Sequence, residues 1–184
     1  MGCNYDVIVV GGGHAGSEAA YISAVMGLKT LLITNSIHHI ALMPCNPAIG
    51  GPGKGHVVME IDALGGLMAK VTDQCTLHIK KVNTGKGPAV QTLRAQTQRD
   101  QYSLIIRKYL ENTPFLSIFQ GEVSDLILNS NGEISGVKIF HGIRFQCRSV
   151  VIATGTFLNG VIMIGEISYP AGRQGEFPAN HLSQ

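Results

Sequence analysis

Runs of consecutive apolar residues near the two ends of the chain predict strands that are buried on both faces. The first run covers residues 6–10, with four β-branched residues in succession, and similar runs cover residues 29–33 and 149–155. Residues 17–26 lie between the first two runs, are rich in Ala and contain no Pro, so they favour a helix. A strand, a helix and a second strand in this order predict an α/β fold with a central parallel sheet.

The central part of the chain predicts two helices separated by irregular segments. Residues 56–69 carry apolar side chains at helical spacing and are expected to form one short helix, with Gly65 and Gly66 breaking or capping it. Residues 72–82 fit either a strand or a loop. Residues 89–111 are expected to form one long polar helix that ends just before the next proline.

After residue 115 the spacing of apolar residues changes from helical to alternating, which is typical of strands. Two tight turns, at Asn131-Gly132 and His141-Gly142, separate the later segments of this region. The pattern predicts a small antiparallel β-meander laid against the main sheet. Its expected strands are residues 117–120, 123–128, 134–140 and 143–147.

The turn after the first strand has the spacing G-x-G-x-x-G and leads into the first helix. It consists of Gly11, Gly12, Gly13, His14, Ala15 and Gly16. The first glycine permits a tight turn, the third lets a pyrophosphate approach the main chain, and the last lets the helix lie close to the strand. A purely structural glycine turn is the alternative. The agreement of strand, spacing and helix favours a Rossmann-like dinucleotide site.

Two other strand ends bear on this site. Thr154 and Gly155 end a buried strand, and ligands of open α/β sheets sit beyond the carboxyl ends of strands, so both are expected beside the dinucleotide. The second strand is expected to end in an acidic residue that binds ribose, but the chain has Thr34 and Asn35 there. These neutral groups can bond ribose hydroxyls, so the ribose contact stays open.

Composition narrows the class of protein. Hydrophobic residues make up 45% and charged residues 14%, which is typical of a folded protein, and no apolar run is long enough to predict a membrane span. The four cysteines, Cys3 among them, form neither a C-x-x-C pair nor a metal pattern with the histidines. With a strand beginning at residue 6, no signal peptide is expected, and the prediction is a reduced, cytoplasmic protein.

Charge is unevenly distributed along the chain. Residues 51–110 contain nine Lys and Arg against four acidic residues, a net +5, whereas the whole chain carries +2. This segment is where an anionic partner would be attracted. Six of its cations could contact phosphates of a flavin or an RNA, the alternative being an ordinary solvated surface. They are Lys54, Lys86, Arg94, Arg99, Arg107 and Lys108.

Cys45 is the sharpest candidate for catalysis. It lies in the Pro- and Gly-rich segment 36–55, which is too long and too rigid to be a simple connector. A constrained loop can aim a thiolate at a substrate, although an ordinary buried thiol is the alternative. The position where flavin-linked disulfide reductases carry a second cysteine is Gly50, so a dithiol relay within the segment is not expected. His38 and His39 are interpreted as structural.

With these motifs in view, the sequence closely resembles the amino-terminal part of the glucose-inhibited division protein A family, also called MnmG. The CNPAIGG run is far more specific than the glycine turn. The matching segments are residues 11–16 (GGGHAG), 45–51 (CNPAIGG), 53–56 (GKGH), 62–69 (DALGGLMA), 86–90 (KGPAV) and 155–158 (GTFL).

The resemblance implies an FAD-dependent tRNA-modifying enzyme. Together with a GTPase of the MnmE type, such enzymes install a carboxymethylaminomethyl-type group on carbon 5 of the wobble uridine. Methylene-tetrahydrofolate supplies the one-carbon unit and NADH reduces the flavin. By position, the glycine turn would hold the FAD pyrophosphate, Val123 would touch the adenine end, and Cys45 would match a cysteine implicated in covalent catalysis. One FAD contact in the family is a Ser where this chain has Ala179, so that hydrogen bond would be absent or made by main chain.

Family members are several times longer than this chain. Residues 1–184 are therefore expected to be the truncated amino-terminal part of an FAD-binding domain, unable to modify tRNA alone, from a full-length protein that forms a homodimer. Two alternatives stay open. One is a folate-dependent tRNA uridine methyltransferase, which shares the glycine turn and is disfavoured by the CNPAIGG run. The other is a non-catalytic FAD-binding scaffold.

Overall fold

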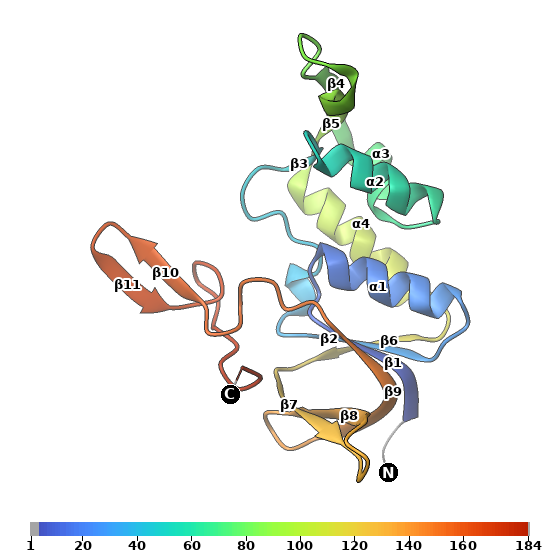
Figure 1. Ribbon diagram of the computed structural model, residues 1–184, viewed down its shortest axis with the longest axis vertical. Helices are drawn as coiled ribbons and strands as arrows, with labels where there is room; N and C mark the ends of the chain where they lie inside the picture. Colours follow the sequence, from blue (N-terminus) through green and yellow to red (C-terminus); the bar gives the residue numbers. More distant parts are fainter. Residues whose placement is uncertain (1–3, 184) are drawn as a thin grey trace.

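A computed structural model of the chain describes residues 4–183, and Cys3 lies outside this range. A six-stranded sheet forms its centre, in the order β6-β2-β1-β9-β8-β7 (Figure 1). Strands β1, β2, β6 and β9 are parallel, whereas β7 and β8 run antiparallel to their neighbours. The bounds are β1 Asn4–Val10, β2 Thr30–Thr34, β6 Leu116–Gln120, β7 Val123–Leu128, β8 Ile134–Ile139 and β9 Arg144–Ile152.

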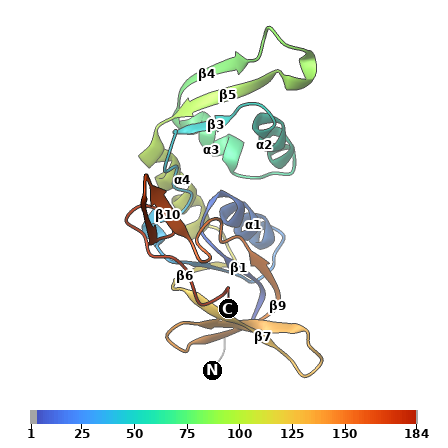
Figure 2. The same cartoon turned by 60° about the vertical axis from the view of Figure 1, so that its left-hand side comes forward.

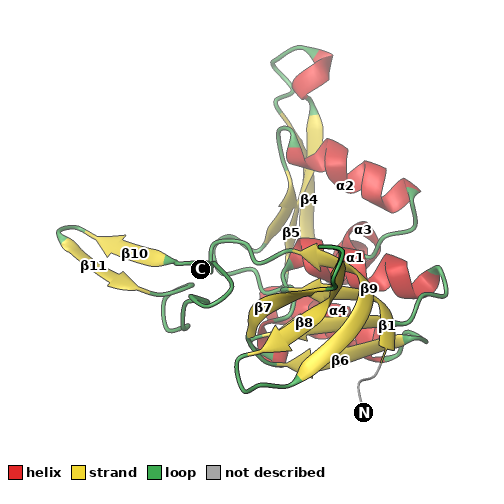
Figure 3. Cartoon of the chain, turned by 60° about the horizontal axis from the view of Figure 1, so that its bottom comes forward, coloured by secondary structure: helices red, strands yellow, loops and turns green. Residues whose placement is uncertain are grey.

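The predicted burial on both faces is confirmed for β1 and β2, but it is wrong for the end of β9, where Val151 is 37% and Ile152 50% exposed. Along β1, Val9 packs with α1 (His14–Val25) and α4 (Arg99–Glu111), whereas Ile8 and Val10 point to the opposite core. That second core is closed by β7 and β8, which curl over the face away from the helices (Figure 3). Alternate residues of one strand thus serve two cores, as the pleat of a strand requires.

A smaller three-stranded antiparallel sheet lies apart from the central one, in the order β3-β5-β4. It consists of β3 (Ala48–Gly50), β4 (Thr76–Val82) and β5 (Thr92–Thr97), and two short helices, α2 (Lys54–Ala63) and α3 (Met68–Cys75), pack beside it. The β4–β5 hairpin projects away from the central sheet (Figure 2). Helix α4 contacts both α3 and β6 and so joins the two parts.

The last described segment leaves the central sheet after β9. It forms an exposed hairpin of β10 (Val161–Ile164) and β11 (Ile167–Pro170), which stands clear of the rest of the chain (Figure 1). Residues 171–183 then run back toward the sheet, where Leu158 and Ala179 form an isolated parallel bridge. We call residues 171–183 the return segment.

Two predicted helices differ from the structure. The expected long helix over residues 89–111 is wrong in its first half, where a 3-10 turn (Pro88–Val90) and strand β5 precede α4. The expected single helix over residues 56–69 is two helices, because Gly65 adopts a φ of +88°, which ends α2. The ambiguous segment 72–82 forms the end of α3 and strand β4.

The meander forms, but its relation to the main sheet differs from the prediction. Residues 144–152 make one strand, β9, whose first part pairs with β8 and which pairs with β1 along most of its length, so the meander continues the central sheet. The segment expected to open the meander is instead β6, which pairs in parallel with β2. The fold class is confirmed: a Rossmann-like α/β domain with a mostly parallel central sheet and additional antiparallel strands.

Candidate functional site

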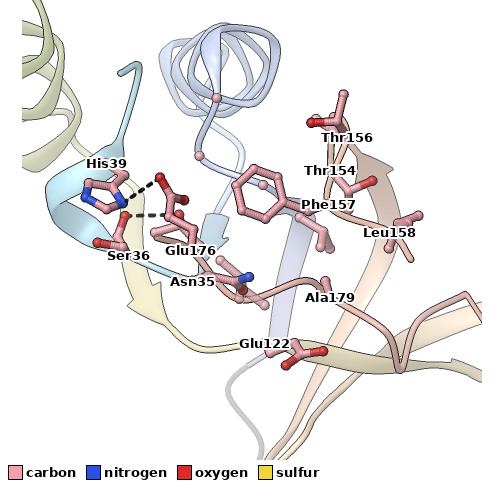
Figure 4. A pocket seen from close by; sticks show the side chains of 18 of the residues that line it. Asn35, Ser36, His39, Glu122, Thr154, Thr156, Phe157, Leu158, Glu176 and Ala179 are labelled. Carbon is pink, nitrogen blue, oxygen red and sulfur yellow. Dashed lines mark hydrogen bonds and ion pairs between the residues drawn. The ribbon is translucent and has the colours of Figure 1, made fainter. Parts of the chain in front are cut away.

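A cavity of about 340 Å³ opens at the carboxyl ends of β1, β2 and β9 (Figure 4). Strand β1 lies between β2 and β9, so the chain leaves β1 toward one side and returns to it from the other. This is the switch point at which open α/β sheets bind ligands, and the volume suits a small-molecule site. The lining includes Gly11, Gly12, Gly13, His14, Val123, Thr154, Gly155 and Ala179.

The glycine turn has the geometry that a phosphate cradle requires. Gly11 has a φ of +111°, and a side chain there would collide with the carbonyl of Ala153 on the neighbouring strand end. A side chain at Gly16 would collide with the carbonyl of Gly11, so this glycine sets the close approach of α1 to β1. At Gly13, by contrast, no protein atom lies within 4 Å of the position that a Cβ would take. The space above Gly13 is therefore open to a ligand.

Helix α1 begins at this open turn. Its N-cap is Gly13, and no side chain caps the helix. The first N–H groups of a helix have no partner within it and carry the positive end of the helix dipole. They can bind an anion at the cavity, which is the way that Rossmann-like domains hold a pyrophosphate. Ala15 is exposed and Gly16 is buried beneath the turn, and neither lines the cavity.

His14 contributes a nitrogen without a partner. Its Nδ1 is buried, and no described residue accepts or donates a hydrogen bond there. The imidazole packs 5.7 Å from the ring of Tyr102, measured between centroids. Burial and, secondarily, the positive charge of Arg173 lower the pKa of His14 below its usual 6.5. A buried polar atom without a partner at a cavity wall is a position where a ligand can supply the missing hydrogen bond.

The end of β2 supplies the polar part of the cavity. Thr34 and Asn35 both line it, but the Thr34 hydroxyl already donates to the carbonyl of Ser36 at 3.2 Å. Asn35 remains as the neutral side chain available for ribose hydroxyls (Figure 4). Val123, only 3% exposed, lines the same cavity at the start of β7, where the resemblance places the adenine end.

The return segment adds polar groups that the sequence did not indicate. Glu176 lies 3.3 Å from His39 Nδ1 and 3.0 Å from Arg173 Nε, and all three side chains line the cavity. Glu122, next to Val123, lies 2.8 Å from His181 Nδ1. These contacts hold residues 171–183 across the cavity, and His39 thereby has an ion-pairing position at the site. Periodicity could not have identified pairs so distant in the sequence.

Ala179 lies at the cavity with its main chain already bonded. Its N–H donates to the Phe157 carbonyl at 2.9 Å, and its carbonyl accepts from Asn159 N–H at 3.3 Å. The N–H is therefore committed to the fold, and the side chain presents only a methyl group. Of the two expectations for this position, a missing hydrogen bond fits the geometry better than one donated by main chain.

Cys45 lies outside the cavity, next to Pro44, which lines it. Its side chain is exposed, and the loop around it is fixed by two contacts to the neighbouring strand and helix. Arg99 Nη2 donates to the Cys45 carbonyl at 2.8 Å, and Thr97 N–H donates to the Pro47 carbonyl at 2.7 Å. Cys45 is thus accessible on a held loop, not buried. Burial raises the pKa of both Cys75 and Cys147, which keeps those thiols protonated and unreactive.

None of the six predicted phosphate-contacting cations lines the cavity. Arg107 lies 3.5 Å from Glu111 and Arg99 binds the Cys45 carbonyl, while Lys54, Lys86 and Arg94 lie on α2 and the β4–β5 hairpin. The structure therefore does not place these cations at the cavity. The arginine of the cavity is Arg173 of the return segment.

Comparison with known proteins agrees with this architecture. The model of the family described as Glucose inhibited division protein A matches residues 6–184. The tRNA uridine 5-carboxymethylaminomethyl modification enzymes MnmG of Syntrophomonas wolfei and Alkaliphilus metalliredigens are 52% and 51% identical to the chain. Each alignment covers 98% of this chain but 29% and 28% of the relative, so the chain spans under a third of their length.

The solved structures lead to the same grouping. Aquifex aeolicus GidA superimposes with a TM-score of 0.93 at 48% identity, covering 98% of this chain and 30% of that one. A GidA-related protein from Thermus thermophilus, 23% identical with a TM-score of 0.70, shares the fold. The resemblance drawn from the motifs is confirmed, and the chain belongs to the glucose-inhibited division protein A (MnmG) family.

Proposed function

We propose that the chain is the amino-terminal, FAD-binding part of an enzyme that modifies uridine in tRNA. The single observation that carries the proposal is the open cradle at Gly13, at the start of α1 and at the switch point of the sheet. A dinucleotide pyrophosphate needs main chain free of side chains beside unpaired N–H groups. The relatives named tRNA uridine modification enzymes supply the reaction class.

We propose that different cavity residues contact different parts of the cofactor. In the proposal, Gly11 to Gly16 hold the pyrophosphate, although Ala15 and Gly16 act through the main chain and the packing of the turn. Val123 touches the adenine end, and Asn35 bonds the ribose. Thr154 and Gly155, at the end of β9, flank the dinucleotide, and Ala179 faces it with a methyl group. When bound, FAD would supply the oxidation and reduction steps of the reaction.

Cys45 is the proposed nucleophile toward the base. Addition of its thiolate to the uracil ring makes carbon 5 electron-rich, which is what attack on a one-carbon unit at that position requires. The exposure of Cys45 leaves it open to a macromolecular substrate. The contacts from Arg99 and Thr97 fix the loop that carries it, so the thiol is presented from a defined position.

The remaining parts of the reaction belong to the longer protein. We propose methylene-tetrahydrofolate and NADH as co-substrates, an MnmE-type GTPase as partner, a homodimer as the assembled form, and the cytoplasm as the location. Among residues 4–183, no helix has the length and apolar character needed to cross a membrane. The isolated segment is proposed to be inactive, because it spans under a third of its relatives.

The experiment is made on the full-length protein with its GTPase partner. The purified protein is expected to show flavin absorbance and to modify the wobble uridine of tRNA. Cys45→Ser is expected to abolish modification and to keep the flavin, because Cys45 lies outside the cavity. Cys147→Ser is the matched control for a buried thiol. Full modification by Cys45→Ser would remove Cys45 from catalysis and make it an ordinary thiol, whereas a parent protein that binds flavin but modifies no tRNA would favour the scaffold reading.

The second candidate, a folate-dependent tRNA uridine methyltransferase, is tested in the same assay. It predicts transfer of a methyl group to uridine without an amine, and mass spectrometry of the digested tRNA separates the two products. The match of 98% of this chain to MnmG enzymes at 52% and 51% identity favours the first reading.

A further inference from the structure

The β4–β5 hairpin projects from the molecule (Figure 2), and its strand pairing gathers basic side chains on one face. Residues directly opposite each other in a strand pair share a face. His78 pairs with Gln96 and Lys80 pairs with Arg94, so these four side chains lie on one face of the hairpin. Lys86 lies in the loop between the strands. We call His78, Lys80, Lys86 and Arg94 the basic face.

The other face of the hairpin has a different character. Ile79 pairs with Ala95 and Lys81 pairs with Leu93, and Ile79 and Leu93 are each about half exposed. Lys81 is therefore a cation on the same strand as Lys80 that points to the opposite side. The hairpin thus provides its own internal comparison between two neighbouring lysines.

No acidic residue neutralises the basic face. Residues 74–99 contain five Lys and Arg and no Asp or Glu. Among the ion pairs of residues 4–183, none includes Lys80, Lys86 or Arg94. Lys80 and Arg94 lie directly opposite each other. Like charges in this arrangement destabilise a strand pair. A bound polyanion would relieve this repulsion.

The hairpin is joined directly to the loop that carries Cys45. Strand β5 pairs on one side with β4 and on the other with β3, which begins three residues after Cys45. Thr97, the last residue of β5, and Arg99 hold the Pro47 and Cys45 carbonyls. A macromolecule bound along the hairpin would therefore lie next to the segment that presents the thiol.

We propose that the basic face of the β4–β5 hairpin binds the phosphate backbone of tRNA and directs it toward Cys45. The proposal rests on the proposed function, which provides the RNA substrate. Several cations on a protruding ribbon can contact backbone phosphates, and such contacts supply most of the sequence-independent affinity of RNA binding. Base stacking contributes little, because the hairpin has no aromatic residue.

The test measures binding of an unmodified tRNA transcript to the full-length, flavin-loaded protein at several salt concentrations. The variant Lys80→Gln/Lys86→Gln/Arg94→Gln removes three charges from the basic face. The control Lys70→Gln/Arg144→Gln/Arg148→Gln removes three exposed charges from other elements. Flavin absorbance checks that both variants fold. Lys81→Gln tests the opposite face of the same strand.

The basic-face variant is expected to bind tRNA about ten-fold or more weakly near 0.15 M salt, with the slope of log affinity against log salt reduced by roughly two. The control triple variant and Lys81→Gln are expected to bind within about two-fold of the parent. Equal weakening by the control triple variant, or none in the basic-face variant, would overturn the proposal. The proposal would also be overturned if the basic-face variant lost affinity for anionic vesicles but bound tRNA as tightly as the parent. If the parent protein binds no tRNA at all, the proposed function fails instead.

Discussion

Gly13 combines an ordinary backbone conformation with an empty neighbourhood. Its φ of −72° is accessible to any residue, and the protein leaves the position of its Cβ free. The fold therefore does not require glycine at this position, in contrast to Gly11 and Gly16, where a side chain would strike main chain. A requirement for glycine at residue 13 would have to come from a ligand.

His14 gives the domain a predicted dependence on pH. Since its folded pKa lies below 6.5, the unfolded chain binds a proton there that the folded chain does not bind. Its contribution to stability is present above pH 6.5 and is lost as the pH falls toward the lowered pKa. His14→Gln is expected to flatten the decrease in the free energy of unfolding of the flavin-free protein between about pH 7 and pH 5. His56→Gln, on α2, serves as the control, and an unchanged slope in His14→Gln would contradict the assignment.

Ala179→Ser tests the missing hydrogen bond. The new hydroxyl would lie at the cavity wall. The main-chain N–H and carbonyl of residue 179 already form hydrogen bonds within the protein. One net hydrogen bond contributes roughly 0.5–1.5 kcal/mol, so the affinity for FAD is expected to rise about 2- to 12-fold, measured by titration of the apoprotein. Ala179→Gly, which adds no donor, should not raise it. Unaltered affinity in Ala179→Ser would mean that the cofactor does not reach this side chain.

Among the elements, helix α3 has an unusual beginning. Its N-cap is Leu67, which has no capping oxygen, and the carboxylate of Glu18 on α1 takes that role. Glu18 accepts from Leu67 N–H at 2.9 Å and from Met68 N–H at 2.5 Å. The carboxylate also lies at the positive end of the helix dipole. One side chain of α1 thus fixes the helix that leads into the β4–β5 hairpin.

Removal of this contact is predicted to weaken the three-stranded β3-β5-β4 sheet, which we call the outer sheet. Glu18→Ala is expected to lower the free energy of unfolding by about 1–3 kcal/mol, because helix N–H groups lose a charged acceptor. Thermal unfolding followed by flavin fluorescence measures the loss. Glu18→Gln keeps one acceptor oxygen and should lose less. Equal stability of Glu18→Ala and the parent would contradict the capping role.

The sequence predicted the elements of the central sheet better than those of the outer sheet. Strands β1 and β2 contain runs of apolar residues, so their burial on both faces is visible in the pattern. Strand β5 (TLRAQT) instead consists largely of residues that favour helices, and only its pairing with β3 and β4 makes it extended. The sequence predicts two strands, residues 143–147 and 149–155, where the structure has the single strand β9. The two are separated in the prediction because exposed residues of β9 interrupt the apolar run.

At the scale of the whole molecule, the cavity was predictable where it is made of main chain and unpredictable where it is made of side chains. The glycine turn and the end of β9 have local signatures in the sequence. Arg173 and Glu176 reach the cavity only because the return segment folds back across it, held by His39 and Glu122. No local pattern records a contact between segments so far apart.

The most direct test of the account is the FAD content of full-length protein in which Gly13 carries a side chain. Gly13→Val is expected to fold and to lose FAD, because the added atoms meet no protein and fill the cradle. Gly87→Val is the matched control, since Gly87 also has a negative φ, of −58°, and an open Cβ position, but lies in the β4–β5 hairpin. The account predicts one flavin per chain in the parent and in Gly87→Val, and none in Gly13→Val. A full complement of FAD in Gly13→Val would contradict it.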